Sequence, residues 1–241
     1  MEEPAQNEPI IVPTAPPEIP PLPWTVRDTW MGALLTLLVM AGIILMFAFL
    51  PRSGLANSIA LVVAEPLFLL PVVIIFGWKR ISWKHLGFRG FKWTGLAIGI
   101  GVLVVVYPLI LIHNLILVWL RMGTQGDSIV QALKNIGSPA LFVLASVILA
   151  PLAEEVLFRG FLFAGFRQRY GWVQAILLSS AIFALFHLQL AAFIPTFMLG
   201  AVLAFTYQRS NSIWPGIILH FLVNALGVCA TLFALQMGAL R

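Results

Sequence analysis

Long hydrophobic stretches separated by short polar segments make up most of this 241-residue chain after residue 23. A helix needs about 20 apolar residues to cross the hydrocarbon core of a bilayer, which is roughly 30 Å thick. The stretches predict seven crossings, at residues 30–50, 57–77, 94–120, 139–158, 172–190, 191–207 and 213–236. Almost no polar residue separates the fifth from the sixth, so a tight hairpin or one interrupted helix is an alternative there. The predicted fold class is an all-α polytopic membrane protein, a bundle of about seven transmembrane helices.

The segment before the first crossing has a different character. Residues 1–23 are rich in proline and acidic, without apolar periodicity, which predicts an extended and flexible tail. The tail lacks the basic start and small-residue cleavage site of a signal peptide, so we expect it to stay on the mature protein. The rest of the chain divides into N-terminal spans at 24–138, with a basic loop at 78–93, and a C-terminal core of spans at 139–241.

The composition excludes several other classes of protein. Hydrophobic residues make up 61% of the chain and charged residues 10%, far from the balance of a soluble domain. The formal net charge is +5, but the basic residues flank apolar stretches, so we expect membrane lipid and not nucleic acid as a partner. The single cysteine, Cys229, excludes an internal disulfide and a CxxC pair.

Basic residues also predict the orientation in the membrane. The loop at 78–93 carries five basic side chains and no acidic one, namely Lys79, Arg80, Lys84, Arg89 and Lys92. Short loops rich in lysine and arginine stay on the cytoplasmic side. We therefore expect a multi-pass protein with a cytoplasmic N-terminus and an outer loop at 121–138. Its location would be the cytoplasmic membrane if the source is a prokaryote.

Two adjacent acids interrupt the fourth hydrophobic stretch. Glu154 and Glu155 are expensive in hydrocarbon, by several kcal/mol each, so such residues usually line a bundle interior or a wet cavity. Glu155 and Arg159 are four apart and can pair on one helical face, whereas Glu154 points about 100° away. Arg159 can then hold one carboxylate while the other acts on water or a ligand. A salt bridge near the helix end is the purely structural alternative.

Later stretches add an amide and imidazoles. His187 follows Phe183 by four residues, and His220 and Asn224 are also four apart on one face. Each alone is explained by hydrogen bonds between helices, but together they predict an intramembrane polar cavity. A carboxylate and an imidazole can activate water, and a second imidazole with an amide can stabilise an oxyanion. Glutamate with two histidines also matches catalytic zinc, and the residues leave both mechanisms open.

These residues fall into three ordered motifs. Residues 154–159 read E-E-V-L-F-R, residues 183–187 read F-A-L-F-H, and residues 220–224 read H-F-L-V-N. They resemble the EExxxR, FxxxH and HxxxN motifs of the CPBP family, the CAAX-protease and bacteriocin-processing group of intramembrane proteases. The resemblance covers about residues 139–226, and no motif residue departs from the pattern.

The resemblance implies a membrane-embedded endopeptidase, and eukaryotic members trim the last three residues from prenylated CAAX proteins. By this resemblance, Glu154 and His187 would activate the water, with Glu155 and Arg159 in support.

The resemblance also implies that His220 and Asn224 stabilise the oxyanion. Family members are described both as metal-dependent and as metal-free, so it leaves open whether the cofactor is a divalent metal such as zinc or none. The implied substrate is a peptide or protein, prenylated or not.

Two other functions remain as alternatives. A family relative without catalysis would act as a membrane scaffold or bacteriocin-immunity factor. A proton-coupled transporter would use Glu65, the acid pair and the histidines as a relay, but the two halves of the chain show no inverted repeat. Glu65 and the pair His113–Asn114 are otherwise assigned to packing. HExxH, GxGD and GxSG motifs of other intramembrane proteases are absent from the sequence.

Overall fold

The computed structural model describes residues 21–49 and 53–238, and in these ranges its regular structure is helical with no strand. This confirms the predicted all-α fold class. In the same ranges, five helical segments are long and apolar enough to span a membrane. They are α1 (Val26–Phe49), α2 with α3 (Gly54–Lys79), α4 (Trp93–Trp119), the composite helix Pro139–Tyr170, and α11 (Trp214–Gln236). The tail predicted at 1–23 lies outside the described residues except for its last three.

Two further helices complete the seven predicted segments. The shorter α9 (Trp172–Phe186) and α10 (Phe193–Ser210), which ends in polar residues, follow each other with a turn between them. Leu188 adopts a left-handed backbone conformation with φ of 51° in this turn, so the chain reverses. The structure thus has a hairpin at the junction. The predicted fifth crossing to residue 190 was too long, because α9 ends at Phe186.

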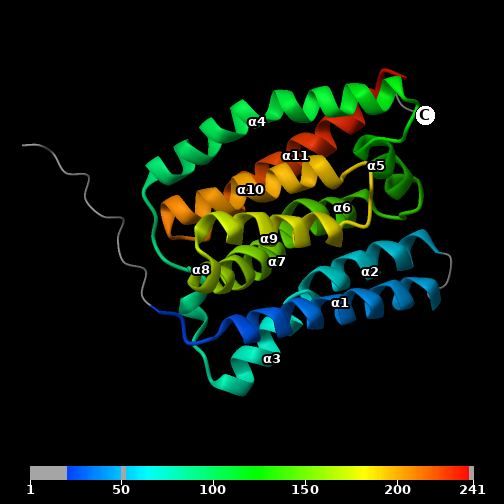
Figure 1. Cartoon of the computed structure of the whole chain (residues 1–241). Helices are drawn as coiled ribbons and strands as arrows, with labels where there is room; N and C mark the ends of the chain where they lie inside the picture. The colour runs from blue at the N-terminus through cyan, green and yellow to red at the C-terminus, as the bar shows by residue number, and fades with distance from the viewer. Residues whose placement is uncertain (1–20, 50–52, 239–241) are drawn as a thin grey trace, which may run out of the picture.

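The second predicted crossing is broken. α2 (Gly54–Leu67) and α3 (Leu70–Lys79) meet at a two-residue turn, and α3 turns away from α2 in Figure 1. Pro66 and Pro71 flank this turn, and each lacks the N–H that a continuous helix needs. The backbone therefore bends where the two prolines remove donors.

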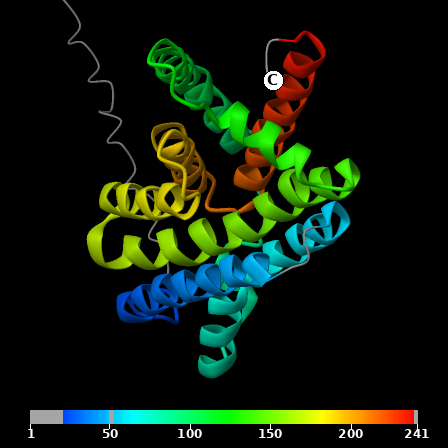
Figure 2. The ribbon, with the colours of Figure 1, turned by 90° about the vertical axis from the view of Figure 1, so that its right-hand side faces the viewer.

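The composite helix is the most enclosed segment of the bundle. It consists of α6 (Pro139–Val143), η2 (Leu144–Leu149), α7 (Ala150–Glu154), η3 (Glu155–Phe163) and α8 (Ala164–Tyr170). It runs beyond the predicted end at residue 158. Figures 1 and 2 show it between α1, α2 and α3 on one side and α4, α10 and α11 on the other. Its phenylalanines at 161, 163 and 166 are fully buried and form the centre of the core.

Two of its pieces, η2 and η3, are π-helices, which the sequence pattern does not predict. Such wider turns occur often at functional sites. In η2 the backbone N–H of Ala150 donates to the carbonyl of Ala145, five residues back. The next residue is Pro151, which has no N–H. Within the helix backbone, the carbonyl of Ser146 is therefore left without its donor.

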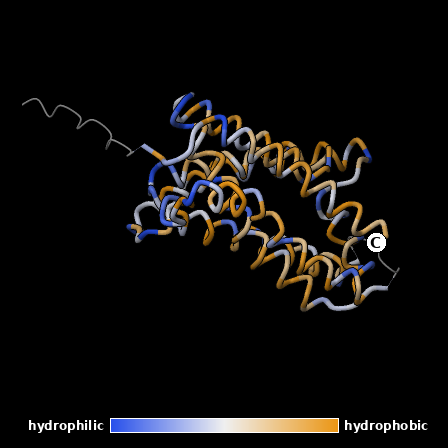
Figure 3. The backbone as a smooth tube through the Cα atoms, turned by 90° about the horizontal axis from the view of Figure 1, so that it is seen from below, coloured by the Kyte–Doolittle hydropathy of each residue, from blue (hydrophilic) through white to orange (hydrophobic). Residues whose placement is uncertain are grey.

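The polar connections also carry helices. The segment 121–138, expected as a loop, contains α5 (Gln125–Lys134), which begins with a capping box between Thr124 and Asp127. The basic loop at 78–93 contains the short helix η1 (Trp83–Leu86). Figure 3 shows hydrophobic residues along the bundle and hydrophilic ones gathered at one end. Exposed apolar side chains such as Leu38, Val105 and Leu115 fit lipid-facing surfaces.

Candidate active site

A buried ion pair forms the base of the candidate site. The Nη1 atom of Arg159 lies 2.7 Å from Oε1 of Glu155, and both side chains are 1% exposed or less. This confirms the pairing predicted from their spacing. The guanidinium also donates from Nη2 to the carbonyl of Gly200 at 3.3 Å and lies 4.3 Å from the centroid of the Phe183 ring. Burying a charge costs several kcal/mol unless it is paired, and these contacts offset that cost.

His220 on α11 lies between the two glutamates. Its Nδ1 is 3.1 Å from Oε1 of Glu155, and its Nε2 is 3.6 Å from Oε2 of Glu154. His220 is buried, whereas the Glu154 side chain is 16% exposed. The first distance is a hydrogen bond and the second is too long for one. One carboxylate therefore holds the imidazole, and the other faces it across a small gap.

A glycine allows α11 to approach the acid pair this closely. Gly216 lies one turn before His220 on the same helical face. A Cβ atom at this position would lie 2.6 Å from Oε2 of Glu155. Any side chain there would displace the carboxylate, so the hydrogen bond to His220 depends on the missing side chain.

His187 and His220 both lie next to the ring of Phe183. The ring centroids of His187 and His220 lie 4.8 and 5.9 Å from that of Phe183. Nδ1 of His187 is 2.9 Å from the backbone carbonyl of Phe183. A carbonyl only accepts, so Nδ1 carries the proton and Nε2 keeps a lone pair. Within the described residues, no hydrogen bond joins His187 to Glu154.

Asn224 has a partner of a different kind. Its Nδ2 donates to the carbonyl of Ser146 at 2.8 Å. This is the carbonyl that the π-helix η2 and Pro151 leave without a donor. One N–H of the Asn224 amide therefore bonds this backbone carbonyl of the composite helix, and the second N–H can donate to another acceptor.

Glu65 adds a third carboxyl group, which the sequence pattern had assigned to packing. It lies on α2, which packs against α7 and η2, and its charge interacts with that of Glu154. Its position in an apolar stretch was visible in the sequence, but its neighbour was not. The contribution of Gly216 had no signal in the sequence, because glycines are common throughout the chain.

The donors fit a shared metal ion poorly. Among the described residues, no group of three or more His, Cys, Asp or Glu side chains is arranged to hold one. The two glutamates approach His220 from opposite ring nitrogens. One ion cannot bind both nitrogens of a ring, so it could not join both carboxylates to this imidazole.

The sequence is similar to known proteins over this part of the chain. Residues 136–226 match the family model described as type II CAAX prenyl endopeptidase Rce1-like. The "Putative membrane peptidase YdiL" of Bacillus subtilis (strain 168) is 29% identical over 102 residues, which are 42% of this chain and 42% of the relative. An "Uncharacterized 24.3 kDa protein" of Escherichia coli is 34% identical over 100 residues, 39% of this chain and 46% of the relative. The chain spans less than half the length of these relatives, and no solved structure matches it.

Proposed function

We propose that the chain is an intramembrane endopeptidase of the CPBP type, because its residues 136–226 match the type II CAAX prenyl endopeptidase Rce1-like family model. The observation that carries the proposal is the position of His220 between Glu154 and Glu155. A purely structural ion pair of Glu155 with Arg159 needs neither the imidazole nor a second carboxylate. The cluster lies near the middle of the composite helix, where unpaired polar groups are most costly.

The contacts of His220 prepare a place for a water molecule. Glu155 is held by Arg159 and accepts a hydrogen bond from Nδ1–H of His220, so in the neutral imidazole Nε2 has a lone pair. Nε2 and the Glu154 carboxylate are then two acceptors that face the same space, 3.6 Å apart. A water molecule donating to both would be oriented and made more nucleophilic.

Hydrolysis would then proceed in two steps. The water oxygen adds to the peptide carbonyl carbon while Glu154 takes a proton from the water. The oxyanion that forms accepts hydrogen bonds, for which Asn224 has a free N–H. When the carbon–nitrogen bond breaks, Glu154 returns the proton to the leaving amine. The family resemblance implies that His187, whose ring contacts the same Phe183 ring as His220, activates the water together with Glu154, and we assign it this role.

We also propose the orientation and the substrate. The five basic residues of loop 78–93 support a cytoplasmic position for this loop and for the N-terminus. Because the composite helix ends near the same side, with Arg167 and Arg169, a substrate would enter from the inner leaflet. The substrate class is a peptide or protein with a prenylated CAAX end, as for eukaryotic members of the family.

Cleavage in liposomes tests the proposal. The wild type is compared with Glu154→Ala and His187→Ala on a prenylated CAAX peptide and on the same peptide without its lipid, each with and without a chelator. We expect Glu154→Ala to lose at least about a hundredfold in rate, as for removal of a general base. His113→Ala is the matched control, since it removes an imidazole from α4 outside the cluster.

The outcomes separate the alternatives. Cleavage by Glu154→Ala at the wild-type rate would refute the catalytic assignment. If the wild type cleaves the peptide without the chelator but not with it, metal-free hydrolysis by Glu154 would be refuted. Proton flux across the vesicles that disappears in Glu154→Ala, without cleavage of either peptide, would favour transport.

A further inference from the structure

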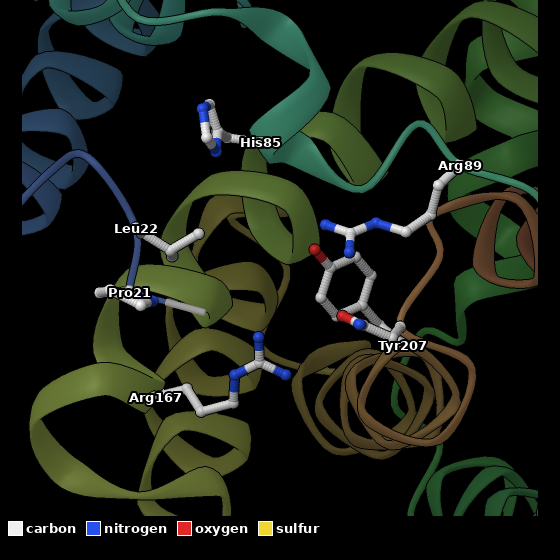
Figure 4. A pocket seen from close by; sticks show the side chains of 7 residues that line it. Pro21, Leu22, His85, Arg89, Arg167 and Tyr207 are labelled. Carbon is white, nitrogen blue, oxygen red and sulfur yellow. The ribbon is translucent and has the colours of Figure 1, made fainter. Parts of the chain in front are cut away.

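A second polar site lies away from the acid pair, at the basic end of the bundle. It is a cavity of about 80 Å³, lined among others by Pro21, Leu22, His85, Arg89, Arg167 and Tyr207 (Figure 4). Arg167 follows Glu155 by twelve residues on the composite helix, which separates the two sites by about 18 Å along its axis. The cavity has room for several water molecules or for one group of the size of phosphate.

The described lining of the cavity carries basic side chains and no acidic one. In the described part of the chain, Arg89, Arg167 and His85 form no ion pair with an acidic side chain. Figure 4 shows the guanidinium of Arg89 beside the hydroxyl of Tyr207 and that of Arg167 directed toward the same ring. The two arginines are close enough for their charges to interact. Like charges held together in a cavity favour binding of an anion between them.

Arg167 is a buried residue with fixed contacts. Its side chain is only 9% exposed. It donates from Nη1 to Oε1 of Gln208 at 2.9 Å, and its guanidinium lies 5.4 Å from the Phe163 ring and 5.9 Å from the Tyr207 ring. Gln208 is neutral, so these contacts orient the guanidinium but leave its charge unbalanced. An unbalanced buried charge costs several kcal/mol, which an anion would offset.

The wall of the cavity is also fixed. Oε1 of Gln168 accepts the backbone N–H of Leu22 at 3.0 Å, and its Nε2 donates to the carbonyl of Trp24 at 3.3 Å. The two hydrogen bonds hold the segment before α1 against α8. The cavity is therefore lined by the segment before α1, the basic loop, α8 and the end of α10.

We propose that this cavity binds a phosphate group between Arg89 and Arg167. Arginine suits this role because its planar guanidinium can bind two phosphate oxygens at once. The phosphate would belong to an anionic phospholipid headgroup or be free in solution. Basic pockets between transmembrane helices are known to bind such headgroups. This site does not depend on the proposed peptidase activity.

Binding to the purified full-length protein in zwitterionic detergent tests the proposal. Isothermal titration calorimetry would use dioctanoyl phosphatidylglycerol in one arm and inorganic phosphate in another, with dioctanoyl phosphatidylcholine as the zwitterionic control. We expect Arg89→Gln and Arg167→Lys each to weaken binding about tenfold or more, because the first removes a charge and the second replaces a planar, two-pronged donor by a single ammonium. Arg209→Gln is the matched control, since it removes an exposed charge at the end of α10 outside the cavity lining.

The two arms identify the source of the phosphate. Binding of phosphatidylglycerol alone, weakened by the two cavity variants, supports a lipid headgroup. Binding of inorganic phosphate with the same losses supports a soluble anion. Absence of saturable binding in both arms overturns the proposal, and so does an equal loss in Arg209→Gln, which would indicate diffuse surface charge. Arg89→Gln changes an exposed side chain, so its result stands even if Arg167→Lys fails to fold.

Discussion

Replacing Gly216 by alanine adds one methyl group at the closest contact between α11 and the acid pair. The new Cβ would lie 2.6 Å from Oε2 of Glu155, whereas an ordinary contact begins at 3.4 Å. The carboxylate must therefore retreat by about 0.8 Å, or α11 must move away by a similar amount. Glu155 is fully buried and forms an ion pair with Arg159, so its carboxylate cannot move without disturbing its neighbours.

Two terms set the size of the effect. Overpacking of a buried site costs about 1–3 kcal/mol, while alanine in a helix gains up to about 1 kcal/mol over glycine. Gly227 lies on the same helix, and a Cβ added there would meet no atom within 4 Å, so Gly227→Ala should show the gain without the cost. The two variants should then differ by about 1–3 kcal/mol, or several degrees in Tm. A displacement near 1 Å at a reacting group can also lower the rate about a hundredfold.

Thermal unfolding in detergent and peptide cleavage in liposomes measure the two effects. We expect Gly216→Ala to lose both stability and activity relative to Gly227→Ala. Equal Tm and equal rates for the two variants would refute the close contact. A lower Tm with an unchanged rate would show that the position of Glu155 does not matter for the chemistry.

Two further substitutions test the contacts around the site. Arg159→Met leaves Glu155 buried without its cation, so we expect a loss of about 3–5 kcal/mol in unfolding free energy, and an unchanged Tm would contradict a buried pair. Asn224→Leu leaves the carbonyl of Ser146 without a donor and should cost about 1 kcal/mol, seen as a Tm lower by about 2–4 °C. In the Asn224→Leu background, Pro151→Ala supplies a backbone N–H near that carbonyl and should recover part of the loss; no recovery would mean that the amide acts elsewhere.

Local chemistry and periodicity made much of the molecule predictable. Apolar stretches of membrane-spanning length predict helices because lipid offers backbone groups no hydrogen-bond partner, and the described residues are indeed helical. The pairing of Glu155 with Arg159 follows from their separation along one helix, which is a local property. The second stretch was predicted as one crossing, whereas the structure divides it into two helices between Pro66 and Pro71.

Relations between helices needed the tertiary structure. Helical periodicity places a side chain on a face but gives no distance to another helix, so it could not show that His220 lies between the glutamates or that the helix of Glu65 packs against that of Glu154. The close approach at Gly216 and the donor from Asn224 to the backbone of η2 also depend on how α11 packs. The order of residues along the chain was enough to predict which polar side chains lie within membrane-spanning stretches. The cost of placing such a side chain there depends on its type and depth, and not on its neighbours in space. Packing of the helices decided which of those groups meet, because only packing fixes the distances on which hydrogen bonds depend.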